Sequence, residues 1–331
     1  MRPARVEWPT VAVAAAIWGG FLVLLFVHDR VPAILIVVIL GVLAAWYGSL
    51  QHEVIHGHPT PWGRVNVALV ATPLTLVVPF STYRDLHLAH HRTPALTDPA
   101  LDPESYYVSA DDWARWGPVR RAGFSVLRTL AGRMVLGPFV AAARTWIGLV
   151  QDARTTRGAW RLAVHVTAVA AVLAVVIVAG VPPLLYIAGV AWLGGALTLL
   201  RSFAEHRWSA EGSRSAVVRS GPVISLLFLN NNLHFTHHKR PGEPWYRLPA
   251  VHRAVDGDAQ AAAGAGLYAS YVELARRYAF HSFDQPVVPT TEQASRGSSG
   301  DRAEDRDGPV EGGGEAAVGA QPGDLGLAGI S

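Results

Sequence analysis

Residues 32–56 read PAILIVVILGVLAAWYGSLQHEVIH, and this stretch joins a long apolar run to a pair of histidines. The apolar part, residues 32–50, is close to the roughly 20 residues that a helix needs to cross a bilayer. His52 and His56 follow four positions apart, so their side chains project from the same face of a helix. The stretch therefore predicts a membrane helix that carries two imidazoles at its end.

Three further apolar runs predict membrane helices. They are residues 10–28, 163–180 and 182–201. Short links around Asp29 and Pro182 join the four runs into two hairpins, with both links on the same side of the membrane. The shorter apolar stretches 65–80 and 222–229 are interpreted as re-entrant or interfacial segments, with a crossing and return by 65–80 as the alternative.

The distribution of arginine predicts the orientation of these helices. Eleven arginines lie from Arg84 to Arg161, whereas the two links together hold only Arg30. The positive-inside rule places the arginine-rich side in the cytoplasm, so we expect an integral protein of a bacterial cytoplasmic membrane. The segment 98–160, rich in tryptophan and arginine, is expected to lie at the membrane interface or in ordinary helix packing.

Composition narrows the possible chemistry. The chain is 16% charged, against about 25% in a typical soluble domain. It contains no cysteine, which excludes disulfides, iron–sulfur clusters and cysteine zinc sites. Any metal must therefore be held by histidine and carboxylate. The formal net charge of +3 is modest and no basic stripe is evident, so no nucleic-acid partner is expected.

These patterns predict an all-α integral membrane domain over residues 1–285. It would consist of four transmembrane helices in two hairpins, short re-entrant or interfacial helices, and a cytoplasmic helical cap that bears the histidines. From residue 286 the sequence becomes rich in glycine, serine and acidic residues, so 286–331 is expected to be a disordered tail.

Two more histidine clusters accompany the first. In each of them the histidines lie at i, i+3 and i+4, which aims three imidazoles at one point. The clusters are His87, His90 and His91, and His234, His237 and His238. With His52 and His56 they offer eight ligands, more than the four that one zinc ion takes, and so indicate a pair of redox metal ions. All three clusters fall on the predicted cytoplasmic side, and His206, just beyond the fourth run, is a ninth candidate.

Polar residues beside the clusters are candidates to orient the imidazoles, because metal-bound histidines donate their second N–H to a carboxylate or carbonyl. The candidates are Glu53, Asp85, Glu205 and Asn231; Asp98, Asp102 and Glu104 are further carboxylates nearby. Solvated surface charge is the alternative for these carboxylates. The three asparagines 230–232 are expected chiefly to cap the helix of the last cluster.

Two other functions fit part of this pattern. Residues 52–56 match the His-Glu-x-x-His motif of zinc metalloproteases, in which Glu53 would act as general base. A protease would leave the other six clustered histidines unused. A membrane metal transporter would need ionisable residues deep inside the spans, whereas His28 and His165 lie near span ends.

The order His-x3-His, His-x2-His-His, His-x2-His-His, threaded between two pairs of membrane helices, resembles the membrane fatty acid desaturase and hydroxylase superfamily. The resemblance covers about residues 10–250 and includes the segment 244–249 after the last cluster. His206 resembles the extra ligand that members carry beyond the fourth span. The resemblance implies a non-haem di-iron centre that uses O2 to remove hydrogen from an unactivated C–H bond of a lipid.

Desaturation of a fatty acyl chain is therefore the expected reaction. A lipid hydroxylase, a carotenoid ketolase or hydroxylase and a fatty acid decarboxylase would share the oxidant and are the alternatives. The sequence shows neither a cytochrome b5 motif nor a glycine-rich dinucleotide motif. Electrons are thus expected from a separate carrier, such as a ferredoxin with its reductase.

Overall fold

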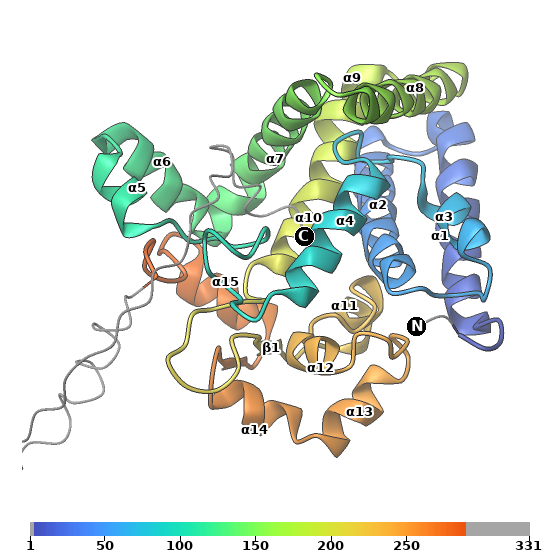
Figure 1. The fold of residues 1–331 in the computed structure, drawn as a ribbon. Coiled ribbons are helices and arrows are strands. Elements are labelled where there is room, and N and C mark those ends of the chain that lie inside the picture. The colour runs from blue at the N-terminus through green and yellow to red at the C-terminus, as the bar shows by residue number, and fades with distance from the viewer. Residues whose placement is uncertain (1–2, 289–331) are drawn as a thin grey trace, which may run out of the picture.

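The computed structural model describes residues 3–288. In this part of the chain almost all regular structure is helical (Figure 1). The exceptions are two short strands, β1 (Val217–Val218) and β2 (Leu267–Tyr268), which pair in parallel with Val217 opposite Leu267. The prediction of an all-α membrane fold is confirmed.

Three long apolar helices form the centre of the molecule. α1 (Trp8–Phe26) and α2 (Ala33–Ile55) are joined by the short 3-10 turn η1 (His28–Arg30). The third begins as α9 (Pro183–Leu185), continues through a π-helical turn, η2 (Tyr186–Ala191), and ends as α10 (Trp192–Ser202). These bounds match the predicted runs 10–28, 32–50 and 182–201 closely at most ends, and α2 continues through His52.

Small residues let α2 and α10 pack closely. A Cβ added at Gly194 would lie 2.8 Å from the Cβ of Ala44, and one added at Gly41 would lie 2.8 Å from Leu193. Such close approach of helix backbones is typical of packing inside a membrane. This packing brings the C-terminal ends of α2 and α10 close together, and with them the histidines that follow each helix.

α8 (Thr156–Val178) completes the second predicted hairpin. Its Val172 and Val176 are buried in the same apolar core as α1 and α2. The two hairpin links also meet, because a Cβ added at Gly180 would lie 3.3 Å from the ring of His28. Both links therefore lie at the same end of the bundle, as the sequence predicts.

A fifth helix is also long and apolar enough to cross a membrane, by length and composition alone. This is α7 (Leu130–Asp152), which the sequence analysis assigned to the mixed segment 98–160. Its apolar pattern is interrupted by Arg133, Pro138 and Arg144, so the sequence did not predict a long helix here. Leu130, at its start, packs in one cluster with Phe203, close to the end of α10.

The apolar stretch 65–80 does not form a long helix. α3 (Gly63–Val70) has eight residues, and the chain then runs irregularly to α4 (Phe80–Arg92). Eight residues rise about 12 Å, well short of the ~30 Å hydrocarbon core of a bilayer. The hydroxyls of Tyr47 and Tyr186 hold the irregular segment by donating to the carbonyls of Thr72 and Leu74, each at 2.7 Å.

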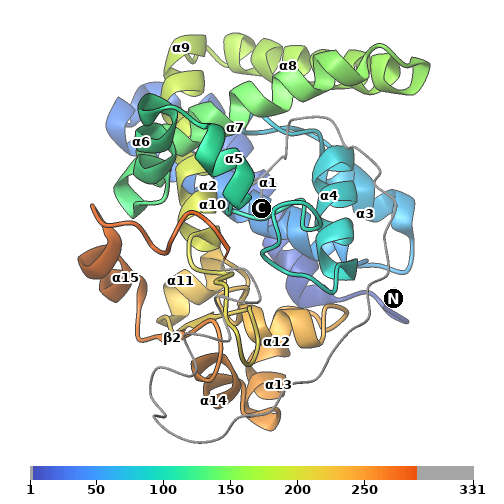
Figure 2. The same cartoon turned by 60° about the vertical axis from the view of Figure 1, so that its left-hand side comes forward.

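The remaining helices build a cap and a side arm. α11 (Pro222–Leu227), α12 (His234–Lys239), α13 (Leu248–Ala254), α14 (Gly257–Ala262) and α15 (Tyr271–Tyr278) gather below the ends of α2, α4 and α10 (Figure 1). α5 (Ala110–Arg115) and α6 (Pro118–Leu127) form a hairpin beside α7 (Figure 2). The cap carries the third cluster.

The predicted tail begins inside the described part of the chain. The backbone N–H of Val108 donates to the carbonyl of Pro286 at 2.9 Å, and Val108 forms an isolated bridge with Val287. Residues 286–288 are therefore attached to the domain rather than separate from it. Residues 289–331 of the predicted tail lie outside the described residues.

Candidate metal centre

Four segments position the predicted histidines at the boundary between the central helices and the cap. His52 lies in the last turn of α2, and His56 immediately follows that helix. α4 carries the second cluster and α12 the third, while His206 follows α10 by four residues. The i, i+3, i+4 spacing turns each set toward one side of its helix.

The structure brings all nine histidines together in two groups. Within each group the candidate ligand nitrogens all lie within 4.8 Å of one another. The first group comprises His52, His56, His87, His91 and His237, and the second comprises His90, His206, His234 and His238. The first group draws on α2, α4 and α12, and the second on α4, α12 and the segment after α10.

Neighbouring nitrogens within a group are evenly spaced. In the second group, Nε2 of His206 lies 2.9 Å from Nε2 of His90 and 2.9 Å from Nε2 of His234. In the first, Nε2 of His91 lies 3.1 Å from that of His87 and 3.0 Å from that of His237. Every one of these contacts uses the Nε2 side of the ring.

The two groups adjoin each other because adjacent residues serve different groups. His90 and His91 are neighbours in α4 but belong to different groups, and so are His237 and His238 in α12. The stacked rings of His91 and His238 have centroids 4.2 Å apart and connect the two groups. The nine imidazoles therefore form one continuous site with two adjoining groups of candidate ligands.

The opposite ring nitrogens are held by oxygen acceptors. Nδ1 of His90 lies 2.7 Å from Oδ1 of Asp102, and Nδ1 of His206 lies 3.1 Å from the carbonyl of Arg214. Nδ1 of His87 lies 3.1 Å from Oε1 of Glu104. An N–H at Nδ1 that donates to such an acceptor leaves a lone pair on Nε2, which is the form that binds a metal.

The protonation of Nδ1 shows whether these residues fit a metal, because it leaves the lone pairs of Nε2 facing one another. Lone pairs that face one another at 2.9 Å, as those of His90, His206 and His234 do, repel unless a cation lies between them. Nε2 of His52 is buried and has no hydrogen-bond partner among the described residues. An unsatisfied buried polar atom costs about 1–3 kcal/mol. The donor set therefore fits a pair of metal ions.

Burial keeps these imidazoles neutral. Burial lowers the pKa of five of them far below the usual range, with help from neighbouring imidazoles. They are His56, His87, His234, His237 and His238. His90 is the exception. Burial lowers its pKa, but the hydrogen bond to Asp102 and the charges of Glu104 and Glu205 together outweigh burial and raise it. Neutral imidazole is the ligand form of histidine.

The carboxylates that hold the second cluster are not those that the sequence favoured. Asp85 is wrong for this role, because its oxygens bond to Arg84 and Arg161 instead. Asp102 and Glu104 take it, from an irregular segment after α4. No helical period relates them to the histidines, so their proximity in sequence was the only available signal.

Two of the other predicted orienting residues do lie beside an imidazole. Nδ2 of Asn231 donates to Oε1 of Glu205 at 2.8 Å, while its Oδ1 lies 3.2 Å from Nδ1 of His234. Glu53 differs, since its Oε2 accepts from the backbone N–H of Trp245 at 3.1 Å. It thereby ties α2 to the segment that follows the third cluster.

The expected asparagine cap of α12 is wrong. The residue that caps this helix is Leu233, with no side-chain hydrogen bond. Asn230 and Asn232 donate instead to the carbonyls of Trp245 and Val218, both at 2.9 Å. They therefore fix the loop that leads into the third cluster.

Two histidines outside the groups have structural partners. Nδ1 of His58 lies 2.9 Å from the carboxylate of Glu7. His252 lies 2.6 Å from Oγ1 of Thr236 and 3.0 Å from Oδ1 of Asp258. Because Thr236 immediately precedes His237, this contact steadies α12.

An apolar cavity of about 80 Å³ opens beside the first group. Gln51 and Tyr83 line its inner end, and the ring of Tyr83 has its centroid 5.8 Å from that of His87. Val77, Val78 and Leu199 are among its apolar walls. Its mostly apolar lining suits an apolar chain, and Tyr83 connects it to the histidines.

Comparison with known proteins agrees with this geometry. The family model described as fatty acid desaturase matches residues 30–270, which is most of the chain and includes all nine histidines. No curated protein matches the chain. The match confirms the resemblance that the histidine clusters indicated. The chain belongs to the fatty acid desaturase family.

Proposed function

We propose that this protein is an O2-dependent di-iron oxidoreductase that introduces a double bond into a fatty acyl chain. Membership of the family makes it a membrane oxidoreductase with a lipid substrate. The observation that carries the finer proposal is the two adjoining groups of imidazoles beside an apolar cavity. When bound, two iron ions would supply the O2-dependent oxidation of a C–H bond.

The spacing of the nitrogens supports iron over zinc. Around an ion with nitrogen ligands at about 2.1 Å, neighbouring nitrogens lie about 3.0 Å apart at right angles and about 3.4 Å apart in a tetrahedron. The observed neighbours lie 2.9–3.2 Å apart. Right angles suit ions that take five or six ligands, and imidazole suits iron.

The same site speaks against a zinc protease. A protease would use His52, His56 and one further ligand, and would leave a position open for water. Here five imidazoles meet at that point, and the carboxylate of Glu53 accepts a hydrogen bond from Trp245.

The cavity residues orient the substrate. The apolar walls around Val77 and Leu199 would hold an extended acyl chain and exclude water from the oxidation. Tyr83 and Gln51, one helical turn before His87 and one residue before His52, would set which carbon faces the metal pair. We assign no general acid or base to the oxidation beyond the histidines that would hold the metal ions.

We also propose that α7 does not cross the membrane. Its first turn is tied to the cap, since the N–H of Ala131 donates to the carbonyl of Ala279 at 3.0 Å. Its end leads by a short link into α8, whose Arg161 donates to Asp85 of α4 at 2.8 Å. Both ends thus lie near histidine-bearing elements, which supports four crossings with all clusters on one side. The distribution of arginine favours the cytoplasm for that side.

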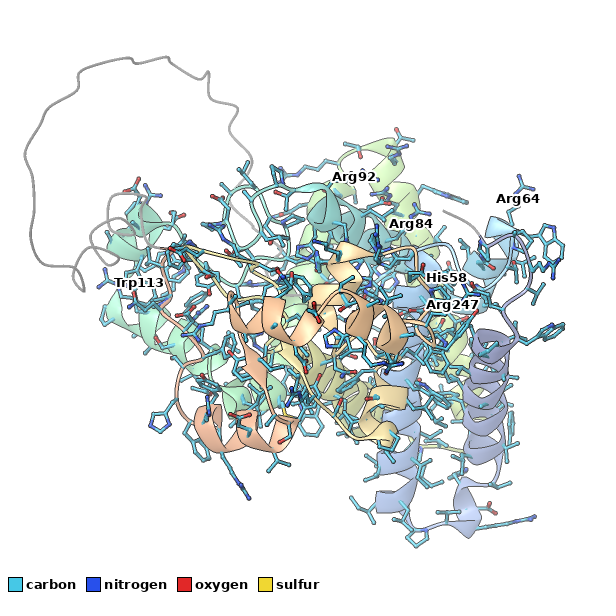
Figure 3. The ribbon with its side chains drawn as sticks, turned by 90° about the horizontal axis from the view of Figure 1, so that it is seen from below. His58, Arg64, Arg84, Arg92, Trp113 and Arg247 are labelled. Carbon is cyan, nitrogen blue, oxygen red and sulfur yellow. The ribbon has the colours of Figure 1, made fainter. Side chains whose placement is uncertain are left out.

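Electrons would enter from a separate acidic carrier such as a ferredoxin with its reductase. Arg64, Arg92 and Arg247 are exposed, and Figure 3, which views the molecule from below, shows where they lie. Arg92 adjoins His91, so a carrier docked on this basic surface would approach the metal pair closely. Complementary charge favours such an encounter.

The test is expression in a bacterial host, with lipid profiling by mass spectrometry and metal analysis of the purified protein. We expect two iron ions per chain and an O2-dependent product with one more double bond. His90→Ala should lose both, whereas His58→Asn, which removes a histidine outside the groups, should keep both. An added oxygen would favour the hydroxylase, and zinc without an O2-dependent product would contradict the proposal.

A further inference from the structure

A second cavity, of about 60 Å³, lies between α6, α7 and α10. Three arginines line it: Arg128, Arg133 and Arg144. Phe124 and Val140 are among its apolar lining residues, and none of its described lining residues is acidic. Positive charge in an apolar cavity is costly unless an anion pairs with it, so the cavity is a candidate anion site.

Among the arginines that line this cavity, Arg133 is the one whose described contacts leave part of the guanidinium without a hydrogen-bond partner. It is 5% exposed, its guanidinium lies 3.6 Å above the ring of Tyr106, and its Nε donates to the carbonyl of Leu127 at 3.3 Å. Its Nη1 is buried and has no hydrogen-bond partner among the described residues. Arg133 therefore keeps a donor and a positive charge for a group that would enter the cavity.

Carboxylates in the neighbourhood are engaged elsewhere. Oε1 of Glu205 accepts from Asn231 at 2.8 Å and lies 3.3 Å from Nε of Arg201. Oδ2 of Asp284 accepts from the hydroxyl of Tyr107 at 2.6 Å. Arg128 reaches backbone carbonyls instead of a carboxylate, among them those of Asp284 and Gln285. The described lining of the cavity holds no carboxylate that pairs with Arg133.

This cavity adjoins the apolar cavity beside His87. Ala141 and Leu199 belong to the walls of both. A molecule with a charged end in the arginine-lined cavity could therefore extend past Leu199 toward Tyr83 and the first histidine group. A fatty acyl lipid has this form, with an anionic head and a long apolar chain.

We propose that the arginine-lined cavity binds the anionic head group of the lipid substrate, and that Arg133 contacts it directly. The proposal rests on the proposed function, since it assigns the substrate of that site. The shared chemistry is a carboxylate or phosphate, which the guanidinium fork can bind through two hydrogen bonds. The source is a free fatty acid in the first case and a phospholipid in the second.

Binding to the purified full-length protein in non-ionic detergent tests this without turnover. The probes are a long-chain fatty acid, its methyl ester, and the lysophosphatidate with the same chain, at about pH 8, where both acids are ionised. We expect one of the anions to bind at least tenfold tighter than the ester. The tighter anion identifies the source, and an ester that binds as tightly as both anions would overturn the proposal.

Arg133→Gln should remove this discrimination and leave ester binding unchanged. The unliganded variant should have a Tm no lower than that of the parent, because an unpaired buried charge costs stability. A merely structural Arg133 predicts the opposite, namely a lower Tm and equal weakening of all three probes. Arg120→Gln, on the exposed side of α6, is the matched control and should keep full discrimination.

Two further outcomes separate this inference from the proposed function. If Arg133→Gln cannot be purified, Arg133→Lys keeps the charge without the planar fork and should reduce the preference for the anion at least threefold. An unchanged preference would contradict direct contact. Head-group discrimination without O2-dependent oxidation would refute the proposed function alone, and oxidation without discrimination would refute this inference alone.

Discussion

Asp102 shows how one carboxylate can control the geometry of the site. Its Oδ1 lies 2.7 Å from Nδ1 of His90 and also accepts the N–H of Glu104 at 2.9 Å. Its Oδ2 accepts the N–H of Thr97 at 2.9 Å. The side chain therefore fixes a histidine and the path of its own loop together.

Asp102→Asn should weaken metal binding by about 10- to 100-fold, because it removes the negative charge that orients His90. Iron affinity measured by competition with a chelator checks this value. Asp98→Asn is the matched control, since Asp98 accepts only from exposed backbone N–H groups of its own turn, such as that of Ala100 at 2.8 Å. Equal affinities in the two variants would exclude the role assigned to Asp102.

Buried histidines also predict how pH affects the metal-free protein. Of the eight group histidines outside the membrane helices, burial lowers the pKa of seven, among them His87 and His234, below the ordinary value of 6.5. In the unfolded chain they regain that value, so below about pH 6.5 the unfolded chain binds more protons. Burial raises the pKa of Glu104, and that of Glu205 to about 7, which opposes this with fewer groups.

The free energy of unfolding of the metal-free protein should therefore decrease as the pH falls below about 6.5. Thermal unfolding followed between about pH 7.5 and about pH 5 should show a declining Tm. A Tm that is constant or rises toward acid would contradict the neutral state of the imidazoles.

At the residue scale, the sequence predicted the histidines better than their supports. Eight of the nine candidates follow from helical spacing, which local sequence encodes directly, and His206 follows from its position just beyond the fourth apolar run. Asp102 and Glu104 lie in a stretch without periodicity, and only the folded path of that stretch brings them to His90 and His87. Asp85 is closer in sequence but faces the other way, toward Arg161.

Among the elements, the contact between α2 and α10 determines how well the site is assembled. Gly194→Ala would place a methyl group 2.8 Å from the Cβ of Ala44 and should cost about 1–3 kcal/mol through overpacking. Gly19→Ala, where an added Cβ meets nothing within 4 Å, should be neutral or stabilising. Thermal unfolding of both variants gives the comparison, and a neutral Gly194→Ala would mean that the helices can separate.

The helices themselves were predictable to different degrees. α1 and the helix that runs from α9 to α10 are largely apolar, so length and hydropathy located them within a few residues. α8 begins seven residues before the predicted run 163–180, because Arg157 and Arg161 lie in its first turns.

α7 was not predicted because Arg133 and Arg144, which line the cavity that it shares with α6, interrupt its apolar pattern. The irregular segment between α3 and α4 depends on the hydroxyls of Tyr47 and Tyr186, which no local pattern announces.

For the whole molecule, the orientation of α7 decides the topology. The chain has no cysteine, so one introduced cysteine gives an unambiguous reading of sidedness. In sealed, oriented vesicles, Arg154→Cys, in the link between α7 and α8, should be labelled from the same side as Ser209→Cys near His206. Asp29→Cys should be labelled from the opposite side. Labelling of Arg154→Cys together with Asp29→Cys would show that α7 crosses.

The cap is the part of the molecule that sequence reasoning described least. β1 and β2 pair residues about fifty positions apart. This pairing fixes the start of the segment that runs from β1 to α12. Their short length leaves no strand pattern to detect. The overall plan could be predicted because the membrane restricts spanning segments to helices, whereas the cap is free of that restriction.

Because α4 and α12 each place neighbouring histidines in different groups, neither group can be arranged alone. The first ion to arrive would order both helices and so reduce the entropic cost for the second. Uptake of iron should then be cooperative, and half-filled molecules should be scarce at every stage of a titration. The protein would pass between an empty and a complete state, and a single iron ion would rarely be left with an open coordination position.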